Sequence, residues 1–298
     1  MGQGQAAETA DGEKLDKIKR LAVVAMVSDD DLLDQLVLKG GNAMDLIHKV
    51  SSRASVDLDF SMADDFEGDI ETVRTTIEGT LRTTFANEGY FAFDVRMTKK
   101  PGNLSDELKS FWGGYSINFK LIATERANSL NFDLRQMQRE AVQLGEGTKF
   151  EIDVSPHEYT EDKLRTKLEG YALYVYTPEM IVCEKLRAIC QQTPDYAKIV
   201  RSMVRNRARD FVDIEVLINN CNVDLGSPSA HRIIKEMFKI KKVPLNFLIR
   251  IEEMRHLHKE GFAQVQATVK ADKELQTFDY YFDFVQSKVQ LLEPIWNE

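Results

Sequence analysis

Apolar and polar positions divide the chain into a first part of mixed periodicity and a second part that is helical. Up to about residue 175, short apolar or alternating runs predict strands, and segments with helical spacing separate them. The predicted strands are 36–39, 56–62, 90–100, 115–123 and 148–156. The predicted helices between them are 12–35, 43–50, 64–89 and 125–144. This alternation is typical of a mixed α/β layer domain.

The second part of the chain has helical periodicity throughout, from Pro178 onward. We therefore predict an α/β domain over 13–170 and a helical C-terminal domain over 171–298. Residues 1–12 are glycine, alanine and polar residues with little to bury, so we expect a flexible N-terminus. The helices predicted in the second part are 178–192, 197–220, 229–239 and 245–260.

Composition is that of an ordinary globular protein, with 43% hydrophobic and 29% charged residues among 298. The apolar run at 21–27 is shorter than the roughly 18 residues that a membrane span needs, and it lies late for a signal peptide. The three cysteines form no metal-ligand or C-x-x-C spacing. We therefore expect a cytoplasmic protein with no membrane partner.

A local cluster of cations contrasts with the net charge of −9. Between 198 and 209 the chain has five basic residues and no acid, which we call the basic stripe. A nucleic-acid backbone is a natural partner for such a stripe, although a solvated basic helix face is the competing interpretation. If the segment is helical, Arg201 and Arg205 share one face. The stripe consists of Lys198, Arg201, Arg205, Arg207 and Arg209.

A glycine pair and two alternating carboxylates stand close together in the stretch 36–62. Gly40 and Gly41 follow a predicted strand and precede a helix that Asn42 can cap. Such a turn lets the backbone approach a ligand, and free N–H groups at a helix start favour phosphate. Asp57 and Asp59 are two residues apart on a strand, so their side chains share one face.

Two carboxylates on one face repel each other unless a cation neutralises them. Mg²⁺ is the cation expected here, because it prefers oxygen ligands and commonly bridges substrate phosphates. We expect Asp153 to supply a third carboxylate and to assist deprotonation of an acceptor hydroxyl, with Glu151 on the same strand as the alternative. Taken singly, a glycine pair is usually a simple turn and an Asp-x-Asp is usually plain surface.

The combination of strand, Gly-Gly, helix and a strand ending in Asp-x-Asp-Phe is the signature of the nucleotidyltransferase fold related to DNA polymerase β. The stretch 38–61 resembles more closely the leading motif of the AbiEii abortive-infection toxins, the group that includes the MenT toxins. Asn42 stands where this family has Thr, and Met44 where it has Leu. A second block resembles the family's Glu-Lys-Leu-x-Ala and Arg-x-Arg-Asp-x-x-Asp segments, through Glu184, Lys185, Leu186, Ala188, Arg207, Arg209, Asp210 and Asp213.

The resemblance implies an α/β (α+β) nucleotidyltransferase fold with a mixed sheet, followed by a helical C-terminal domain. It also implies a toxin with a cognate antitoxin. Several members of the family transfer nucleotides from an NTP to the tRNA 3′ end, and the acceptor varies among members. Activity in the family needs residues matching Asp57, Lys185 and Asp210. The residues themselves agree, because Lys185 can neutralise a triphosphate and Asp210 can orient that lysine. The Ser55 hydroxyl can hydrogen-bond the triphosphate.

Three functional hypotheses remain open on the sequence. The acceptor for the nucleotide is an RNA such as tRNA, contacted through Lys198, Arg201 and Arg205, or it is a protein or small-molecule hydroxyl. The basic stripe favours RNA. The third hypothesis is a non-catalytic binding or scaffold protein, for which Asp57 would be dispensable.

Overall fold

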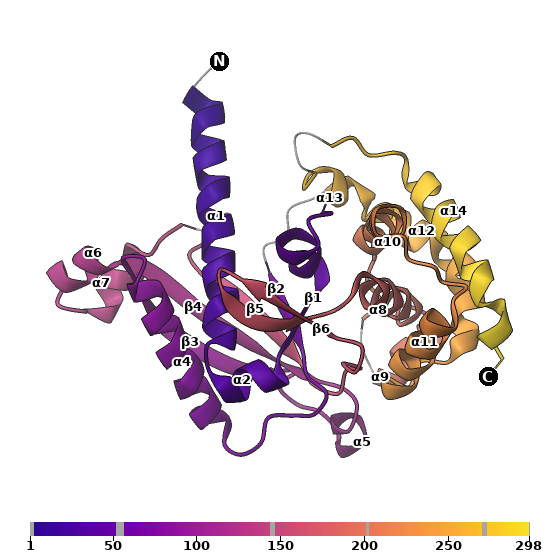
Figure 1. Ribbon diagram of the computed structural model, residues 1–298, viewed down its shortest axis with the longest axis horizontal. Helices are drawn as coiled ribbons and strands as arrows, with labels where there is room; N and C mark the ends of the chain where they lie inside the picture. The colour runs from indigo at the N-terminus through magenta and orange to yellow at the C-terminus, as the bar shows by residue number, and fades with distance from the viewer. Residues whose placement is uncertain (1–2, 52–56, 144–146, 201–202, 270–272, 298) are drawn as a thin grey trace.

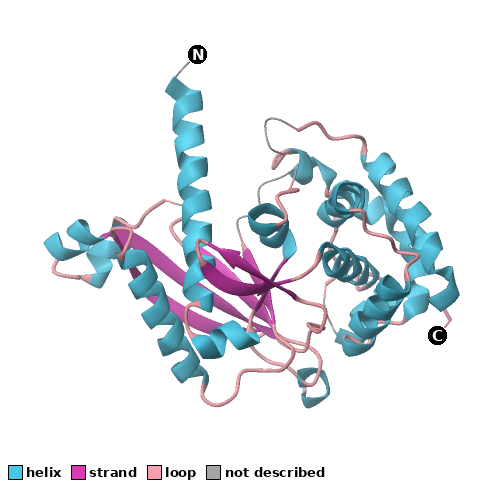
Figure 2. Ribbon diagram, in the orientation of Figure 1, coloured by secondary structure: helices cyan, strands magenta, loops and turns pink. Residues whose placement is uncertain are grey.

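The computed structural model describes residues 3–51, 57–143, 147–200, 203–269 and 273–297, with side chains from residue 12 onward (Figure 1). Strands gather in one half of the molecule, and the other half is built from the C-terminal helices alone (Figure 2). One hydrophobic core runs through both halves. Within the described residues, no helix is long and apolar enough to cross a membrane.

Seven strands form one mixed sheet in the order β3-β4-β5-β2-β1-β7-β6. The pairs β2/β5 and β1/β7 are parallel, and the other neighbours are antiparallel. Strand β5 alternates strictly between buried apolar and half-buried polar residues, as a strand with one covered face should. The strands are β1 Val37–Lys39, β2 Leu58–Ser61, β3 Tyr90–Lys100, β4 Gly114–Ala123, β5 Phe150–Ser155, β6 Leu164–Leu168 and β7 Tyr171–Val175.

Helices α1 and α4 pack against each other on one face of the sheet, as Figure 1 shows. Helix α4 buries Ile77, Leu81 and Phe85, which lie one turn apart and form its apolar stripe. The helices of this half are α1 Gln3–Val27, α2 Asp30–Gln35, α3 Gly40–Asn42, the π-helical turn η1 Ala43–Ile47, α4 Ile70–Ala86, α5 Asp106–Lys109, α6 Thr124–Ser129 and α7 Leu134–Arg139.

Helix α8 is the centre of the helical half, where it packs against α10 and α11. It starts with Thr177, whose side chain accepts the Met180 N–H, followed by Pro178 in the first turn. The elements are α8 Pro178–Cys190, α9 Pro194–Val200, α10 Ala208–Cys221, α11 Pro228–Ile240, the 3-10 helix η2 Leu245–Met254, α12 Arg255–Glu260, α13 Phe262–Gln266, α14 Phe278–Val289 and the 3-10 helix η3 Gln290–Ile295.

Two expected boundaries differ in the structure. Residue 170, expected to separate the domains, lies between β6 and β7, so the sheet extends to Val175. Sequence periodicity did not reveal these two strands, because β6 is a mostly exposed edge strand and β7 is a short run of five residues. Helix α1 begins at Gln3, within the segment that we expected to lack regular structure.

Four predicted helices are each divided in the structure. The helix predicted over 12–35 is α1 and α2, and the helix predicted over 245–260 is η2 and α12. The helix predicted over 125–144 is α6 and α7, because Asp133 caps a new helix through the Gln136 N–H. The helix predicted over 197–220 is α9 and α10, and residues 203–207 between them are not helical. There the backbone N–H groups of Arg205 and Arg207 donate to side chains of other segments instead.

Candidate active site

The glycine turn after β1 brings the backbone close to the Asp59 carboxylate on β2. Gly40 has φ +67°, and a Cβ at this position would lie 2.9 Å from Asp59 Oδ2. Only glycine combines this conformation with this close approach. The expected helix cap at Asn42 is wrong, because its side chain makes no capping hydrogen bond to η1. Its Nδ2 instead donates to the Asp57 carbonyl oxygen at 2.5 Å and so ties the glycine turn to the acidic strand.

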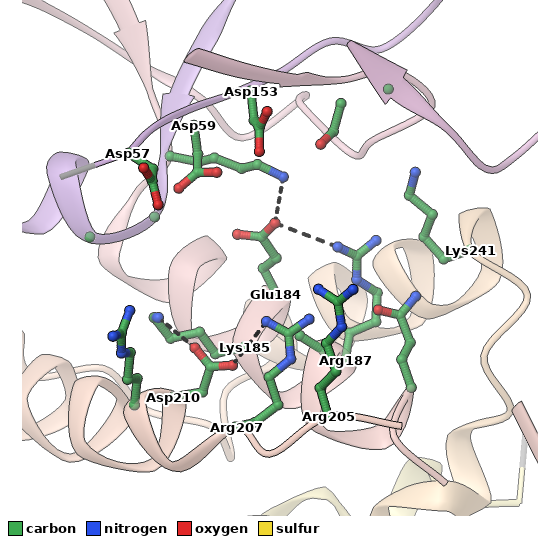
Figure 3. Close-up of a pocket in the computed structure, with 18 of the residues that line it drawn as sticks. Asp57, Asp59, Asp153, Glu184, Lys185, Arg187, Arg205, Arg207, Asp210 and Lys241 are labelled. Atoms are coloured by element: carbon green, nitrogen blue, oxygen red, sulfur yellow. Dashed lines mark hydrogen bonds and ion pairs between the residues drawn. The ribbon is translucent and has the colours of Figure 1, made fainter. Parts of the chain in front are cut away.

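Three predicted carboxylates line one cleft of about 1030 Å³ between the sheet and the helical half. Asp57 directly precedes β2, Asp59 lies within β2, and Asp153 lies on the parallel neighbour β5, where it is the register partner of Asp59. Figure 3 shows the three side chains along the upper wall, on the sheet. The alternation expected for Asp57 and Asp59 therefore does bring both into one site.

The electrostatics of this wall favour a bound cation. Burial, with added repulsion from neighbouring carboxylates, raises the pKa of Asp59 to about 7 against the attraction of Lys39. Burial also raises the pKa of Asp57, with added repulsion from Glu151 and Asp153. Ionising both carboxylates together costs free energy. A cation that prefers oxygen ligands, such as Mg²⁺, would stabilise their charged forms.

The donor set fits Mg²⁺ at Asp57 and Asp59, while Asp153 is engaged elsewhere. In the described part of the chain, no three acidic, histidine or cysteine side chains lie close enough to hold a metal ion as they stand. The Asp153 carboxylate accepts a hydrogen bond from Lys100 Nζ at 3.0 Å, and Lys100 also pairs with Glu151. Glu151 does not line the cleft and accepts from Ser116 Oγ, so Asp153 is the better third carboxylate.

The opposite wall holds the second pair of predicted residues, on α8 and α10. Lys185 is buried, and its Nζ donates to Asp210 Oδ1 at 2.9 Å and to Asp213 Oδ2 at 2.7 Å. The expected contact between Lys185 and Asp210 is therefore present. The lysine is not the exposed point charge that we expected to face a triphosphate, because two carboxylates already match its charge.

Arginines beside this buried pair provide positive charge at the cleft. Arg205 and Arg209 are exposed and line the cleft, and Arg207 is half-buried with Nη1 3.7 Å from Asp210 Oδ2. The basic stripe is therefore not one helix face. Lys198 lies on α9, outside the cleft, and pairs with Asp195 at 2.9 Å. Arg201, like Ser55 on the acidic side, lies outside the described residues.

A buried ionic cluster, which the sequence did not predict, lies at the floor of the cleft. Lys39 Nζ lies 2.7 Å from Glu184 Oε1, and Arg187 joins Glu184 to Glu158, as the dashed lines of Figure 3 show in part. Lys241 Nζ lies 3.3 Å from Glu158 Oε1. Each of these residues lines the cleft, although four of them are more than 90% buried. The ionic cluster is Lys39, Glu158, Glu184, Arg187 and Lys241.

The ionic cluster was missed because its members come from four separate segments. Lys39 directly precedes the glycine pair, and Glu184 and Arg187 flank Lys185 on α8, so these three carried a sequence signal. Glu158 and Lys241 follow β5 and α11 without any motif. Burial opposes ionisation of Glu158, yet Arg187, Lys241 and Lys39 together hold its pKa at about 2. Burial lowers the pKa of Lys241 to about 8.

Comparison with solved structures finds similar chains along almost the whole length. JHP933 from Helicobacter pylori is 17% identical, with 95% of this chain and 91% of that chain covered and a TM-score of 0.46. MenT4, the nucleotidyltransferase toxin Rv2826c from Mycobacterium tuberculosis H37Rv, is 13% identical, with coverages of 96% and 85% and a TM-score of 0.46. No curated protein sequence matches the chain significantly.

The family comparison covers both walls of the cleft. The family model described as nucleotidyl transferase AbiEii toxin, type IV TA system, matches residues 22–284. This range includes the glycine turn, the carboxylates of β2 and β5, and the Lys185–Asp210 pair. The chain therefore belongs to the AbiEii family of nucleotidyltransferase toxins from type IV toxin–antitoxin systems.

Proposed function

We propose that this toxin transfers a nucleotide from an NTP to an RNA acceptor such as the tRNA 3′ end, with release of pyrophosphate. The observation that carries the proposal is the cleft in which a glycine turn and three strand carboxylates face a wall of arginines. A cognate antitoxin is the partner implied by the family. Cytoplasmic localisation remains a prediction.

The reaction follows from the charges on the two walls. The backbone of Gly40 and Gly41 receives the triphosphate. Asp57 and Asp59 would hold Mg²⁺, which when bound would neutralise negative charge on the reacting phosphates. Asp153 accepts the proton of the acceptor hydroxyl after the hydrogen bond from Lys100 to Asp153 breaks. The hydroxyl oxygen forms a bond to the α-phosphorus, the bond between that phosphorus and the β-phosphate oxygen breaks, and pyrophosphate leaves.

Lys185 and Asp210 contribute to the proposed reaction as a preorganised pair. The ion pair fixes Asp210 on the cleft wall, where it lies beside Arg207. Arg205, Arg207 and Arg209 then face the phosphates of the NTP or of the RNA. The basic wall favours RNA over a small cationic acceptor, which would prefer an acidic cleft.

The test is incubation with each labelled NTP and total tRNA, with and without EDTA. We expect label on the tRNA in the presence of Mg²⁺, and background label with EDTA or with Asp57→Ala. Asp106→Ala is the matched control, because Asp106 is exposed and lies outside the cleft. Label on the protein or on a small molecule would identify the alternative acceptors. Full activity of Asp57→Ala would remove the catalytic proposal and leave a binding or scaffold role.

A further inference from the structure

Trp112 is an aromatic side chain in the cleft that the proposed reaction does not use. It lies between α5 and β4, is half-buried, and lines the same cleft as the carboxylates. Tyr115 is the other aromatic among the described residues lining this cleft, and it is buried with its hydroxyl donating to Asp65. Trp112 therefore presents the accessible ring in a site otherwise formed mainly by charged and small residues.

The sheet order places Trp112 at the opposite side of the carboxylates from the glycine turn. Strands β1, β2, β5 and β4 are successive neighbours. The glycine turn follows β1, Asp59 and Asp153 lie on β2 and β5, and Trp112 shortly precedes β4. Three strand spacings separate β1 from β4, or roughly 14 Å across the sheet. A nucleotide with its triphosphate at the glycine turn thus has space for a nucleoside on the Trp112 side.

The ring is held in place by contacts at this end of the cleft. Its centroid lies 6.0 Å from that of Tyr196, which is fully buried. The Tyr196 hydroxyl donates to the Lys241 carbonyl oxygen at 2.6 Å and accepts from Gln191 Nε2 at 3.2 Å. Lys241 lies at the other end of the view from Asp57 in Figure 3. A fixed, half-exposed indole is a preorganised surface for stacking.

We propose that Trp112 is a stacking platform for a nucleobase. The base belongs to the NTP or to the terminal nucleotide of the RNA acceptor, and both offer the same planar face. This inference rests on the proposed function, because it supplies a subsite for the nucleoside part of those substrates. The phosphate-binding residues lie on the glycine-turn side and on the arginine wall, whereas Trp112 recognises the base.

Tryptophan fluorescence reports directly on the ring, because the chain has only two tryptophans and their signals can be separated. Subtracting the emission of Trp112→Phe from that of the wild type isolates the Trp112 signal. We expect saturable quenching of this signal by an NTP or by a short single-stranded RNA, and none by inorganic tripolyphosphate. Quenching by the NTP alone assigns the base to the NTP, and quenching by RNA alone assigns it to the acceptor.

Binding measurements separate this inference from the proposed function. Trp112→Leu should weaken binding of the quenching ligand about 5- to 100-fold, and Trp112→Phe should weaken it less, because Phe keeps an aromatic face. Thermal melts check that both variants fold. NTP binding by calorimetry, with no change in Trp112 emission on adding either the NTP or the RNA and with equal affinity of Trp112→Leu for both, would overturn the platform alone. Absence of both NTP binding and transfer in the wild type would overturn the proposed function and the platform with it.

Discussion

At Gly40, both the positive φ of the backbone and the closeness of the Asp59 carboxylate require a residue without a Cβ. The sequence predicted a phosphate-binding turn from the glycine pair, and the structure shows what the turn must avoid, namely Asp59 Oδ2. The residues predicted by spacing, Asp57, Asp59 and Asp153, lie together for the reason given by the alternation of strands. The burial of Lys185 was not predictable, because no charge pattern in the sequence distinguishes its partner Asp213 from a surface aspartate.

Replacing Gly40 by alanine should damage activity more than a matched glycine replacement does. Both Gly40→Ala and Gly68→Ala place a side chain at positive φ, which costs about 1–2 kcal/mol of stability. A Cβ at Gly68 meets nothing within 4 Å, whereas one at Gly40 displaces Asp59. We therefore expect about a hundredfold loss of nucleotide transfer for Gly40→Ala only. Urea denaturation and label incorporation measure the two effects, and equal activity losses would contradict the role of Asp59.

Among the elements, the segment 203–207 shows most clearly how tertiary contacts replace helical ones. The sequence of this segment is compatible with a helix, but its backbone N–H groups bind side chains from elsewhere. Gln192 Oε1 accepts from Arg205 N, and His258 Nδ1 accepts from Arg207 N. The arginine wall of the cleft therefore depends on α12, an element that carried no functional motif.

His258 should make stability depend on pH. Burial lowers its pKa to about 4, with Asp210 raising and Arg207 lowering it. The unfolded histidine takes up a proton near its ordinary pKa of about 6.5, so the unfolded state binds more protons between these values. Stability is therefore full above about pH 6.5 and is lost as pH falls toward 4, by about 2–3 kcal/mol in all.

The control for this prediction is His258→Asn, which keeps an acceptor near Arg207 N but cannot titrate. Urea denaturation near pH 7.5 and near pH 5.5 gives the pH dependence of each protein. We expect a loss of about 1 kcal/mol in the wild type beyond any loss in the variant. Burial also lowers the pKa of His48, but this contribution is common to both proteins and cancels. Identical pH dependence in the two proteins would mean that His258 keeps its ordinary pKa in the fold, so that burial does not lower it.

At the scale of the whole molecule, the ionic cluster joins the sheet to the helical half beneath the cleft. Lys39 belongs to β1, Glu158 follows β5, Arg187 lies on α8 and Lys241 follows α11. These elements meet where the hydrophobic core of both halves is continuous, so the cleft walls are fixed relative to each other. Buried charges of this kind are costly to leave without their partners.

Removing Arg187 should therefore destabilise the protein far more than removing an exposed arginine with similar bonds. Arg187→Leu leaves Glu158 and Glu184 buried with less compensation, at a cost of about 3–5 kcal/mol. Arg126→Leu removes an exposed pair with Glu140, which water screens, so it should cost far less than Arg187→Leu. Urea denaturation of both variants gives the comparison. Similar small losses would show that the cluster does not hold the two halves together.

The arginine wall should determine how tRNA binding depends on salt. Arg205→Glu removes a cation from the cleft, so it should weaken tRNA binding and lower the salt slope by about one. Lys198→Glu is the control outside the cleft, where Asp195 already pairs with the lysine. We expect a smaller effect from it. Filter-binding titrations at several salt concentrations measure both, and equal effects would mean that RNA binds through diffuse surface charge.

The sequence by itself determined the first five strands, the glycine turn, the acidic strand and the family. These features depend on local periodicity and on short spacings, which act within one element. Only the tertiary structure decided that Lys185 is buried between Asp210 and Asp213, and that β6 and β7 complete the sheet. It also decided the ionic cluster and the position of Trp112, because both join segments far apart in the chain. Such contacts arise from packing and burial, which no local pattern records.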